Sequence, residues 1–150
     1  MKMNVIIDKG FEKIRKKVLD SDSKPIIYSS DDDDLNRRVM EKLKIDVLLL
    51  SQKNRKDFSK QRNSGLNHVL AKIAKKNDIG IGIDLDEIIE ASGFGLAEIL
   101  SRVRQNIFLC NKAKVQMKFI AREKKNSRNI YDLRSLGLVL GMPTWMTKRL

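Results

Sequence analysis

The chain has very little of several residue types, and each shortage argues against a class of function. Its single cysteine, Cys110, excludes an internal disulfide framework and falls in phase with an apolar helix face. Its single histidine, His68, leaves too few nitrogen ligands for the zinc clusters of metal phosphoesterases. Aromatic residues make up only 5% of the 150 residues, so stacking of single-stranded bases is weakly supported.

Long apolar segments are also missing. No apolar run approaches the roughly 20 residues that a membrane-spanning helix needs, and the opening MKMNVIIDKG has too short an apolar core for a signal peptide. There is no Gly-rich dinucleotide fingerprint, because GIG at 80–82 lies inside a predicted strand, and no Ser-His-Asp arrangement is readable. We therefore expect an intracellular protein with no membrane partner, cytoplasmic or, in a eukaryote, nuclear.

Positive charge, in contrast, is abundant. The chain has 31 Lys and Arg against 19 Asp and Glu, which gives a net charge of +12 and a pI near 9.9. Such an excess favours a polyanionic partner, and nucleic acid is the first expectation. Because aromatics are sparse, contact with the backbone phosphates of structured RNA or DNA fits better than stacking of bases.

Short apolar runs alternate with helical patterns along the chain. We predict strands over 4–7, 25–29, 46–51, 79–85 and 115–121, and helices over 11–19, 35–45, 65–76, 95–113 and 132–141. Strict alternation predicts one parallel α/β domain over residues 1–150. A complete (β/α)₈ barrel usually needs at least ~200 residues, so we expect an open sheet or a partial barrel. In either case functional groups gather at the carboxyl ends of the strands.

Two acidic clusters follow predicted strands. SSDDDD (29–34) directly precedes a predicted helix, and we interpret it as an N-cap with carboxylates at the positive helix end rather than as a Mg²⁺ site. DLDEIIE (84–90) places Asp84 and Asp86 on one side of an extended strand. That pair leaves an alternative function open, a Mg²⁺-dependent phosphoesterase.

The densest basic segment is KNRKDFSKQRNSGLNHV (53–69). Asn63 or Ser64 is expected to cap the helix that follows, and Gly65 to let a ligand approach the backbone. Free amides at this helix start attract phosphate. A helical wheel buries Leu66, Val69, Leu70, Ile73 and Ala74, and it places His68, Lys72, Lys75 and Lys76 on the outer face.

A second basic segment, REKKNSRNIYDLRS (122–135), follows the fifth predicted strand at the same end of the sheet, with Asp132 expected to cap the last helix. Arg128 and Arg134 are expected to fork onto phosphate oxygens. The predicted RNA-binding residues of the two segments are Lys53, Arg55, Lys56, Lys60, Arg62, His68, Lys72, Lys75, Arg122, Arg128 and Arg134. A solvated surface with no ligand remains the alternative.

The order of these motifs resembles a known family. RKD…SGLNHVLAKIAKK, IGIGIDLDEII, SRVRQNIFLCNKAKVQMKFIA and YDLRSLGLVLGM, over about 45–142, are similar to the thirty-kilodalton protein subunit of ribonuclease P, called protein component three in archaea. The resemblance implies a TIM-barrel-like fold related to polymerase and histidinol phosphatase domains that have lost their metal ligands. It makes a phosphoesterase of that type, using Asp84 and Asp86, the alternative. Relative to the family, strand-helix units before Asn4 are expected to be missing, and FSKQRN (58–63) splits the RKD…SG motif.

The resemblance also implies a function. The chain would be a non-catalytic, RNA-binding subunit of the ribonucleoprotein that removes 5′ leaders from precursor tRNA. It would bind no cofactor, because the RNA carries the catalytic Mg²⁺. Its expected partners are ribonuclease P RNA, protein component two and, indirectly, precursor tRNA. RNA contact carries over to Arg55, Lys56, His68 and Arg134.

Overall fold

The computed structural model describes residues 3–150, which form a five-stranded parallel sheet covered by helices. The strands are β1 (Val5–Ile7), β2 (Ile27–Ser29), β3 (Val47–Leu50), β4 (Gly80–Asp84) and β5 (Met117–Ile120). The helices are α1 (Phe11–Leu19), α2 (Asp33–Lys42), α3 (His68–Lys76), α4 (Leu85–Glu90), α5 (Gly93–Ala113), α6 (Ile130–Leu140) and α7 (Thr144–Thr147), with a 3₁₀ turn η1 (Lys124–Asn126).

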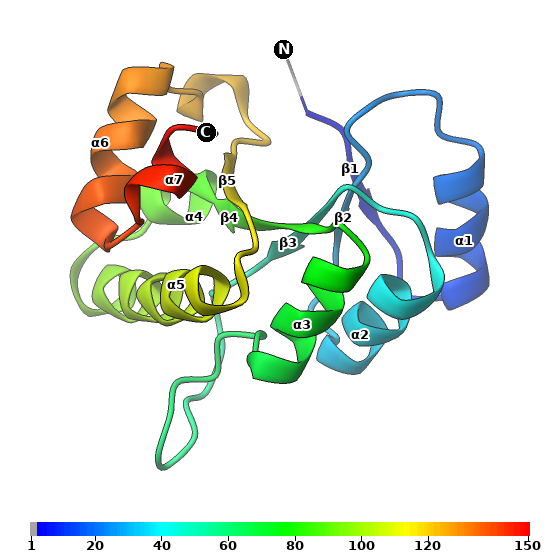
Figure 1. Ribbon diagram of the computed structural model, residues 1–150, viewed down its shortest axis with the longest axis horizontal. Helices are drawn as coiled ribbons and strands as arrows, with labels where there is room; N and C mark the ends of the chain where they lie inside the picture. Colours follow the sequence, from blue (N-terminus) through cyan, green and yellow to red (C-terminus); the bar gives the residue numbers. More distant parts are fainter. Residues whose placement is uncertain (1–2) are drawn as a thin grey trace.

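The strands pair in the order in which they follow one another, β1-β2-β3-β4-β5, and all four pairs are parallel. The helices follow in order around one side of the sheet (Figure 1). Sequential parallel strands with helices on one side are the arrangement of a (β/α) barrel, whereas a doubly wound sheet reverses its strand order. The predicted α/β, TIM-barrel-like fold is confirmed. Within residues 3–150 the sheet is open, with β1 and β5 at its edges.

Both faces of the sheet are apolar, which explains why the predicted strands read as continuous hydrophobic runs. Tyr28, Leu48 and Ile81 belong to the main core between sheet and helices. The inner face carries a second cluster, Ile27, Val47, Leu49 and Ile120, each at most 2% exposed.

Gly82 allows this inner cluster to close. A Cβ at this position would lie 3.1 Å from side-chain atoms of Val47 and Leu49 and 3.2 Å from Ile120. Without a side chain on β4, residues of β3 and β5 pack over it and complete the inner core.

The predicted core position of Cys110 is confirmed. Cys110 is 0% exposed, and burial raises the pKa of its thiol to about 12. Met142 and Met146 are buried, and Trp145 packs partly buried against the same core. Within residues 3–150 no helix has both the length and the apolarity to cross a bilayer.

The acidic run before α2 acts as the predicted cap. The Asp32 carboxylate accepts hydrogen bonds from the backbone N–H groups of Asp34 and Leu35, at 3.0 and 3.1 Å. Asp33 and Asp34 fall in the first turn, where the helix dipole favours negative charge. Because Asp32 is the cap, α2 begins two residues before the predicted start at 35.

Two other predicted caps are wrong. Asn67 caps α3 by accepting from Leu70 N at 2.9 Å, so the helix begins at His68 and neither Asn63 nor Ser64 caps it. Ser64 is instead buried, at 1% exposed. Asn129, not Asp132, caps α6, accepting from the backbone N–H of Asp132 at 2.9 Å. In each case an Asn nearer the helix start takes the cap.

The expectation that Asp84 and Asp86 share one side of an extended strand is wrong. β4 ends at Asp84, whose side chain accepts from Glu87 N at 3.3 Å and so caps α4. Asp86 lies in the first turn of this helix. The two carboxylates therefore do not share one side of an extended strand.

The outer face of α3 is confirmed. His68, Lys72, Lys75 and Lys76 are all exposed. The buried stripe differs by one position: Ala71 is 0% exposed, whereas Val69 is 39% exposed. α3 packs against both α5 and α2.

Candidate functional site

A cavity of about 610 Å³ opens at the carboxyl ends of the strands. Its lining carries both signs of charge. The acidic members come from the turn after β2, from the start of α2 and from α4, and the basic members come from the loop after β3 and from the residues just after β5. The acidic members are Asp31, Asp33, Asp86, Glu87 and Glu90, and the basic members are Lys53, Arg55, Lys56 and Arg122.

The carboxylates of Asp84 and Asp86 are occupied by internal contacts. A guanidinium nitrogen of Arg122 lies 2.7 Å from Asp84 Oδ2, and the Asp84 side chain is 1% exposed. Asp86 accepts from Arg122 N and from Asn126 Nδ2, both at 2.9 Å. Across residues 3–150 no three His, Cys, Asp or Glu side chains are grouped to hold a metal ion. The phosphoesterase alternative is therefore not supported, because Arg122 takes the position that a cation would need.

Glu87 fixes the start of the loop that follows β3. Its carboxylate accepts a short hydrogen bond from the Ser51 hydroxyl and one from Gln52 N at 2.8 Å. Gln52 is 2% exposed, and its amide donates to Ser64 O at 2.9 Å, which joins the two ends of the loop. The loop over 51–67 therefore begins and ends at fixed points.

Arg55 is held inside this loop. Its guanidinium makes two hydrogen bonds to Asp33, at 2.9 and 3.0 Å, and its side chain is 9% exposed. It also donates to Ser51 O at 2.6 Å. Much of the charge of this predicted phosphate contact is therefore shared with a carboxylate.

Gly65 serves Arg55 rather than a ligand. Its φ is +77°, and a Cβ there would lie 2.7 Å from Arg55 Nη2. The expectation that Gly65 lets a ligand reach the backbone is corrected, because the close approach is made by the protein's own guanidinium.

Arg102 on α5 is the main anchor of the basic loop, and sequence reasoning missed it. Its side chain is 3% exposed and donates to Gln52 O at 2.9 Å, to Arg55 O at 2.8 Å and to Asp57 Oδ1 at 3.0 Å. The Arg102 hydrogen bond is the largest cause that lowers the pKa of Asp57, and the Asn63 N–H and Arg62 add to it. The signal was present, because Arg102 falls at helical spacing between the buried Ile99 and Asn106.

Two more α5 residues that were not predicted complete the attachment. Gln105 exchanges hydrogen bonds with the Arg62 backbone, at 3.3 Å from Arg62 N and 2.9 Å to Arg62 O. Asn106 donates to Ser64 O at 3.2 Å. The loop is therefore held by side chains from two successive turns of α5, which carry Arg102, Gln105 and Asn106.

What remains free on this loop is a set of lysines. Lys53, Lys56 and Lys60 are exposed and form no salt bridge within the described residues. Arg62 pairs with Asp57 at 3.0 Å, with its side chain 44% exposed. Figure 1 shows the loop between β3 and α3 projecting from the body of the molecule.

The second basic segment is also partly engaged. Arg122 is bound to Asp84, and Arg134 donates to Thr147 O at 3.2 Å, which ties α6 to the C-terminal segment. Arg128 is exposed, although it donates to the backbone oxygens of Lys125 and Ser127 at 3.1 and 3.0 Å. Lys124 and Lys125 in η1 are exposed and were not among the predicted contacts.

The outer stripe of α3 extends away from the loop. His68 begins the helix, and its side chain makes no hydrogen bond to residues 3–150, so no group orients it as a general base. Lys72 follows one turn later. Lys75 lies in the last turn and donates to Lys114 O at 3.2 Å, at the opposite end of the strands. The structure does not bring Lys75 together with loop 53–63.

The carboxyl end as a whole is not positive. Its segments, 8–10, 29–34, 51–63, 84–90 and 121–129, contain ten Lys and Arg and eleven Asp and Glu. Internal pairs such as Arg122 with Asp84 also occupy part of the positive charge that is present. A polyanion at this end therefore meets free positive charge chiefly on the exposed lysines of the projecting loop and of η1.

Comparison with known proteins gives a consistent result. The model of the family RNase P subunit p30 matches residues 15–149. The chain is 33% identical over 104 residues to ribonuclease P protein component 3 of Methanococcoides burtonii, covering 69% of this chain and 39% of that protein. It is 30% identical over 106 residues to the protein of that name from Methanococcus vannielii, covering 71% and 41%. The chain thus spans about 40% of the length of these relatives.

A solved structure shares the fold. A chain of an assembly described as "cryo-EM structure of archaeal Ribonuclease P with mature tRNA" superposes with a TM-score of 0.80 and 25% sequence identity. The superposition covers 96% of this chain and 62% of the other. The five-stranded arrangement is therefore shared with a component of that assembly.

Proposed function

Because this chain belongs to the ribonuclease P subunit p30 family, we propose that it is a non-catalytic, RNA-binding subunit of ribonuclease P. In this role it supports removal of the 5′ leader from precursor tRNA by the catalytic RNA. The family match over residues 15–149 carries the proposal. The likeness to a chain of an archaeal ribonuclease P assembly supports it.

The contact would be electrostatic. The proposed set is the one read from the sequence: Lys53, Arg55, Lys56, Lys60, Arg62, His68, Lys72, Lys75, Arg122, Arg128 and Arg134. Within it the exposed loop lysines have their full charge available. Arg55, Arg122 and Arg134 hold the loops in shape through internal bonds. Lysines neutralise phosphates without reading sequence, so we expect binding to follow the shape of the RNA backbone.

The chemistry would belong to the RNA. We propose that Mg²⁺ is held by the RNA subunit, and that the protein's contribution is to stabilise the RNA fold that positions the metal. The internal pairing of Asp84 and Asp86 with Arg122 agrees with a protein that supplies no metal ligands at this end. Protein component two is the proposed protein partner, precursor tRNA is met indirectly, and the proposed location is the cytoplasm, or the nucleus in a eukaryote.

Reconstitution tests this proposal. A transcribed archaeal ribonuclease P RNA, the partner protein and precursor tRNA are assayed for 5′ cleavage with and without this chain. We expect the chain to raise the cleavage rate at low Mg²⁺, and the chain alone to cleave nothing. Cleavage by the protein in the absence of RNA would reverse the assignment.

A pair of loop variants tests the surface itself. Lys56→Gln with Lys60→Gln removes two exposed charges, and Lys13→Gln with Lys16→Gln removes two from the exposed side of α1 as a matched control. Each released phosphate contact contributes about 0.7–0.9 to the slope of log affinity against log salt. The loop pair should therefore make the slope shallower by about 1.4–1.8, whereas the control pair should leave it unchanged. If the loop variant and the α1 control gave the same slope of log affinity against log salt, a phosphate contact at the loop would be contradicted.

A further inference from the structure

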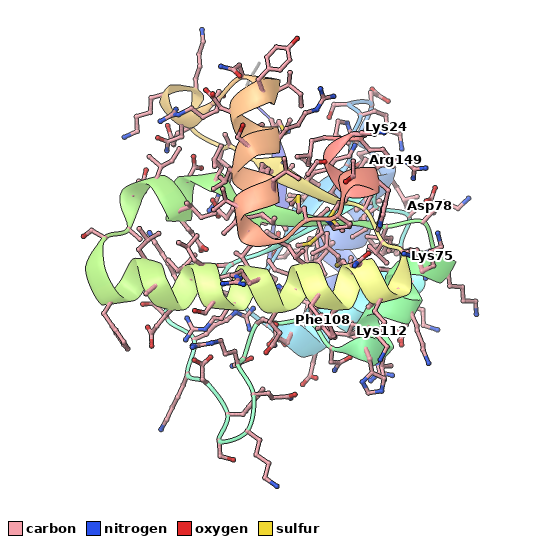
Figure 2. All side chains as sticks on the ribbon, turned by 60° about the vertical axis from the view of Figure 1, so that its left-hand side comes forward. Lys24, Lys75, Asp78, Phe108, Lys112 and Arg149 are labelled. Atoms are coloured by element: carbon pink, nitrogen blue, oxygen red, sulfur yellow. The ribbon has the colours of Figure 1, made fainter. Side chains whose placement is uncertain are left out.

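The opposite end of the strands carries its own basic surface. A cavity of about 560 Å³ opens there, between the amino ends of β3, β4 and β5. Lys24, Lys118 and Arg149 line it, together with Asp46 and Asp78. The positive charge continues over the ends of α3 and α5. We call Lys24, Lys75, Lys112, Lys114, Lys118 and Arg149 the amino-end surface. Figure 2 shows Lys24, Arg149, Lys75 and Lys112 along one side of the molecule.

The two carboxylates that line the cavity, Asp46 and Asp78, compensate the positive charge of this surface only in part. Lys24 lies 3.6 Å from Asp46 with its side chain 70% exposed, and it is the one member in a salt bridge among residues 3–150. Lys118 and Arg149 are exposed and line the cavity without a carboxylate partner in that range. At the carboxyl end, in contrast, Arg55 and Arg122 are each bound to an aspartate.

Helix dipoles account for only part of the pattern. Lys75 and Lys112 stand in the last turns of α3 and α5, where positive charge is favourable whether or not a ligand binds. Lys118 lies on a strand, so no helix dipole explains its position. It lies in the middle of β5, beside Gly82 in the register, between Met117 and Phe119 of the main core. Its side chain is therefore on the inner face of the sheet, where the neighbouring side chains form an apolar cluster.

The chemistry of this surface fits a phosphate backbone better than an acidic protein. Charged residues, lysine in particular, are depleted at the core of specific protein interfaces. Three basic side chains, in contrast, line this cavity together with the apolar Pro25 and Val47. Among the exposed large apolar side chains, Phe108 is the nearest in sequence to a member of the amino-end surface. It is 68% exposed and lies one helical turn before Lys112. A lone aromatic beside lysines suits contact with one base at the edge of a backbone contact. Figure 2 shows Phe108 near Lys112.

We propose that the amino-end surface is a second RNA-binding site, which takes a backbone segment different from the one that meets loop 53–63. The two surfaces lie at opposite ends of the same strands, so one molecule would connect two segments of a folded RNA. This inference rests on the proposed function only for the identity of the ligand as RNA. Its residues, apart from Lys75, lie outside the contact set assigned above.

Salt dependence separates the two surfaces. Lys118→Gln with Arg149→Gln is compared with the Lys13→Gln and Lys16→Gln control, and each pair lowers the net charge of +12 by two. With the archaeal ribonuclease P RNA as probe, the cavity pair should make the salt slope shallower by about 1.4–1.8. The control pair should leave the slope unchanged. Combining the cavity pair, Lys118→Gln with Arg149→Gln, with the loop pair, Lys56→Gln with Lys60→Gln, should double the change in slope. An unchanged slope for the cavity pair alone would overturn the second site and leave the loop contact intact.

Directed cleavage locates the two segments. Cys110 is the single cysteine and is buried, so an introduced cysteine can be labelled selectively with an iron chelate. We expect Lys60→Cys and Lys112→Cys, each labelled, to cut two separate groups of nucleotides in the RNA. Cutting from Lys60→Cys alone would refute the second site while keeping the proposed function. If neither labelled variant cleaves the RNA, both the proposed RNA-binding function and the second site would be refuted.

Discussion

Removal of the Arg102 side chain is the sharpest test of how this structure holds its basic loop. In Arg102→Met the loop loses three hydrogen bonds, to Gln52 O, Arg55 O and Asp57. Gln52 is 2% exposed, so water does not readily replace the lost donor. A buried acceptor left without its donor costs roughly 1–3 kcal/mol. Gln52 O would bear this cost in full and Arg55 O in part. We therefore expect the free energy of unfolding to fall by about 2–4 kcal/mol.

The measurement is urea unfolding, with the free energy of unfolding extrapolated to water. Arg104→Met is the matched control, because Arg104 is an exposed arginine two residues further along the same helix. It should change stability by less than about 0.5 kcal/mol. Arg102→Lys keeps the charge but not the three-way donation, so it should fall between the two. If Arg102→Met costs no more than the control, Arg102 does not anchor the loop.

Two further predictions concern the same loop. The lowered pKa of Asp57 means that its contribution to stability is present above the ordinary pKa of 3.8 and is lost as the pH falls through the lower folded value. The difference in free energy of unfolding between the wild type and Asp57→Asn, measured by urea unfolding, should therefore become smaller below about pH 3.8. A difference that stays constant as the pH is lowered would contradict this prediction. Gly65→Ala should destabilise the protein by about 1–3 kcal/mol because a positive φ is strained with a side chain. It should also displace the Arg55 guanidinium, since the new Cβ would lie 2.7 Å from it. A thermal melting point equal to that of the wild type would contradict this.

Much of the architecture was readable from local patterns. The five apolar runs became the five parallel strands in order, because strands buried on both faces need continuous hydrophobic residues. The acidic run before α2 was correctly read as a cap, because capping depends on residues within one turn. The helix ends were less accurate: when several Asn, Ser or Asp residues stand near a start, the sequence does not say which of them the turn will use.

The candidate site was harder to read. Sequence placed Arg122 among the phosphate contacts by charge, and Arg55 by charge and by the family resemblance. Nothing local shows that Asp84 and Asp33 will lie beside them. These pairs join residues 22 and 38 positions apart. Arg102 was overlooked for a related reason. Its helical phase pointed inward, but its partners lie 45 to 50 residues earlier in the chain.

The charge of the chain, its alternation of strands and helices, and its family could all be read from the amino-acid sequence. These properties follow from composition and from short-range periodicity. Tertiary structure decided which positive charges are free, because that depends on which carboxylates the fold brings near them. It neutralised Arg122 against Asp84, left Lys56 and Lys60 exposed on the projecting loop, and placed Lys118 in a cavity at the far end of the strands.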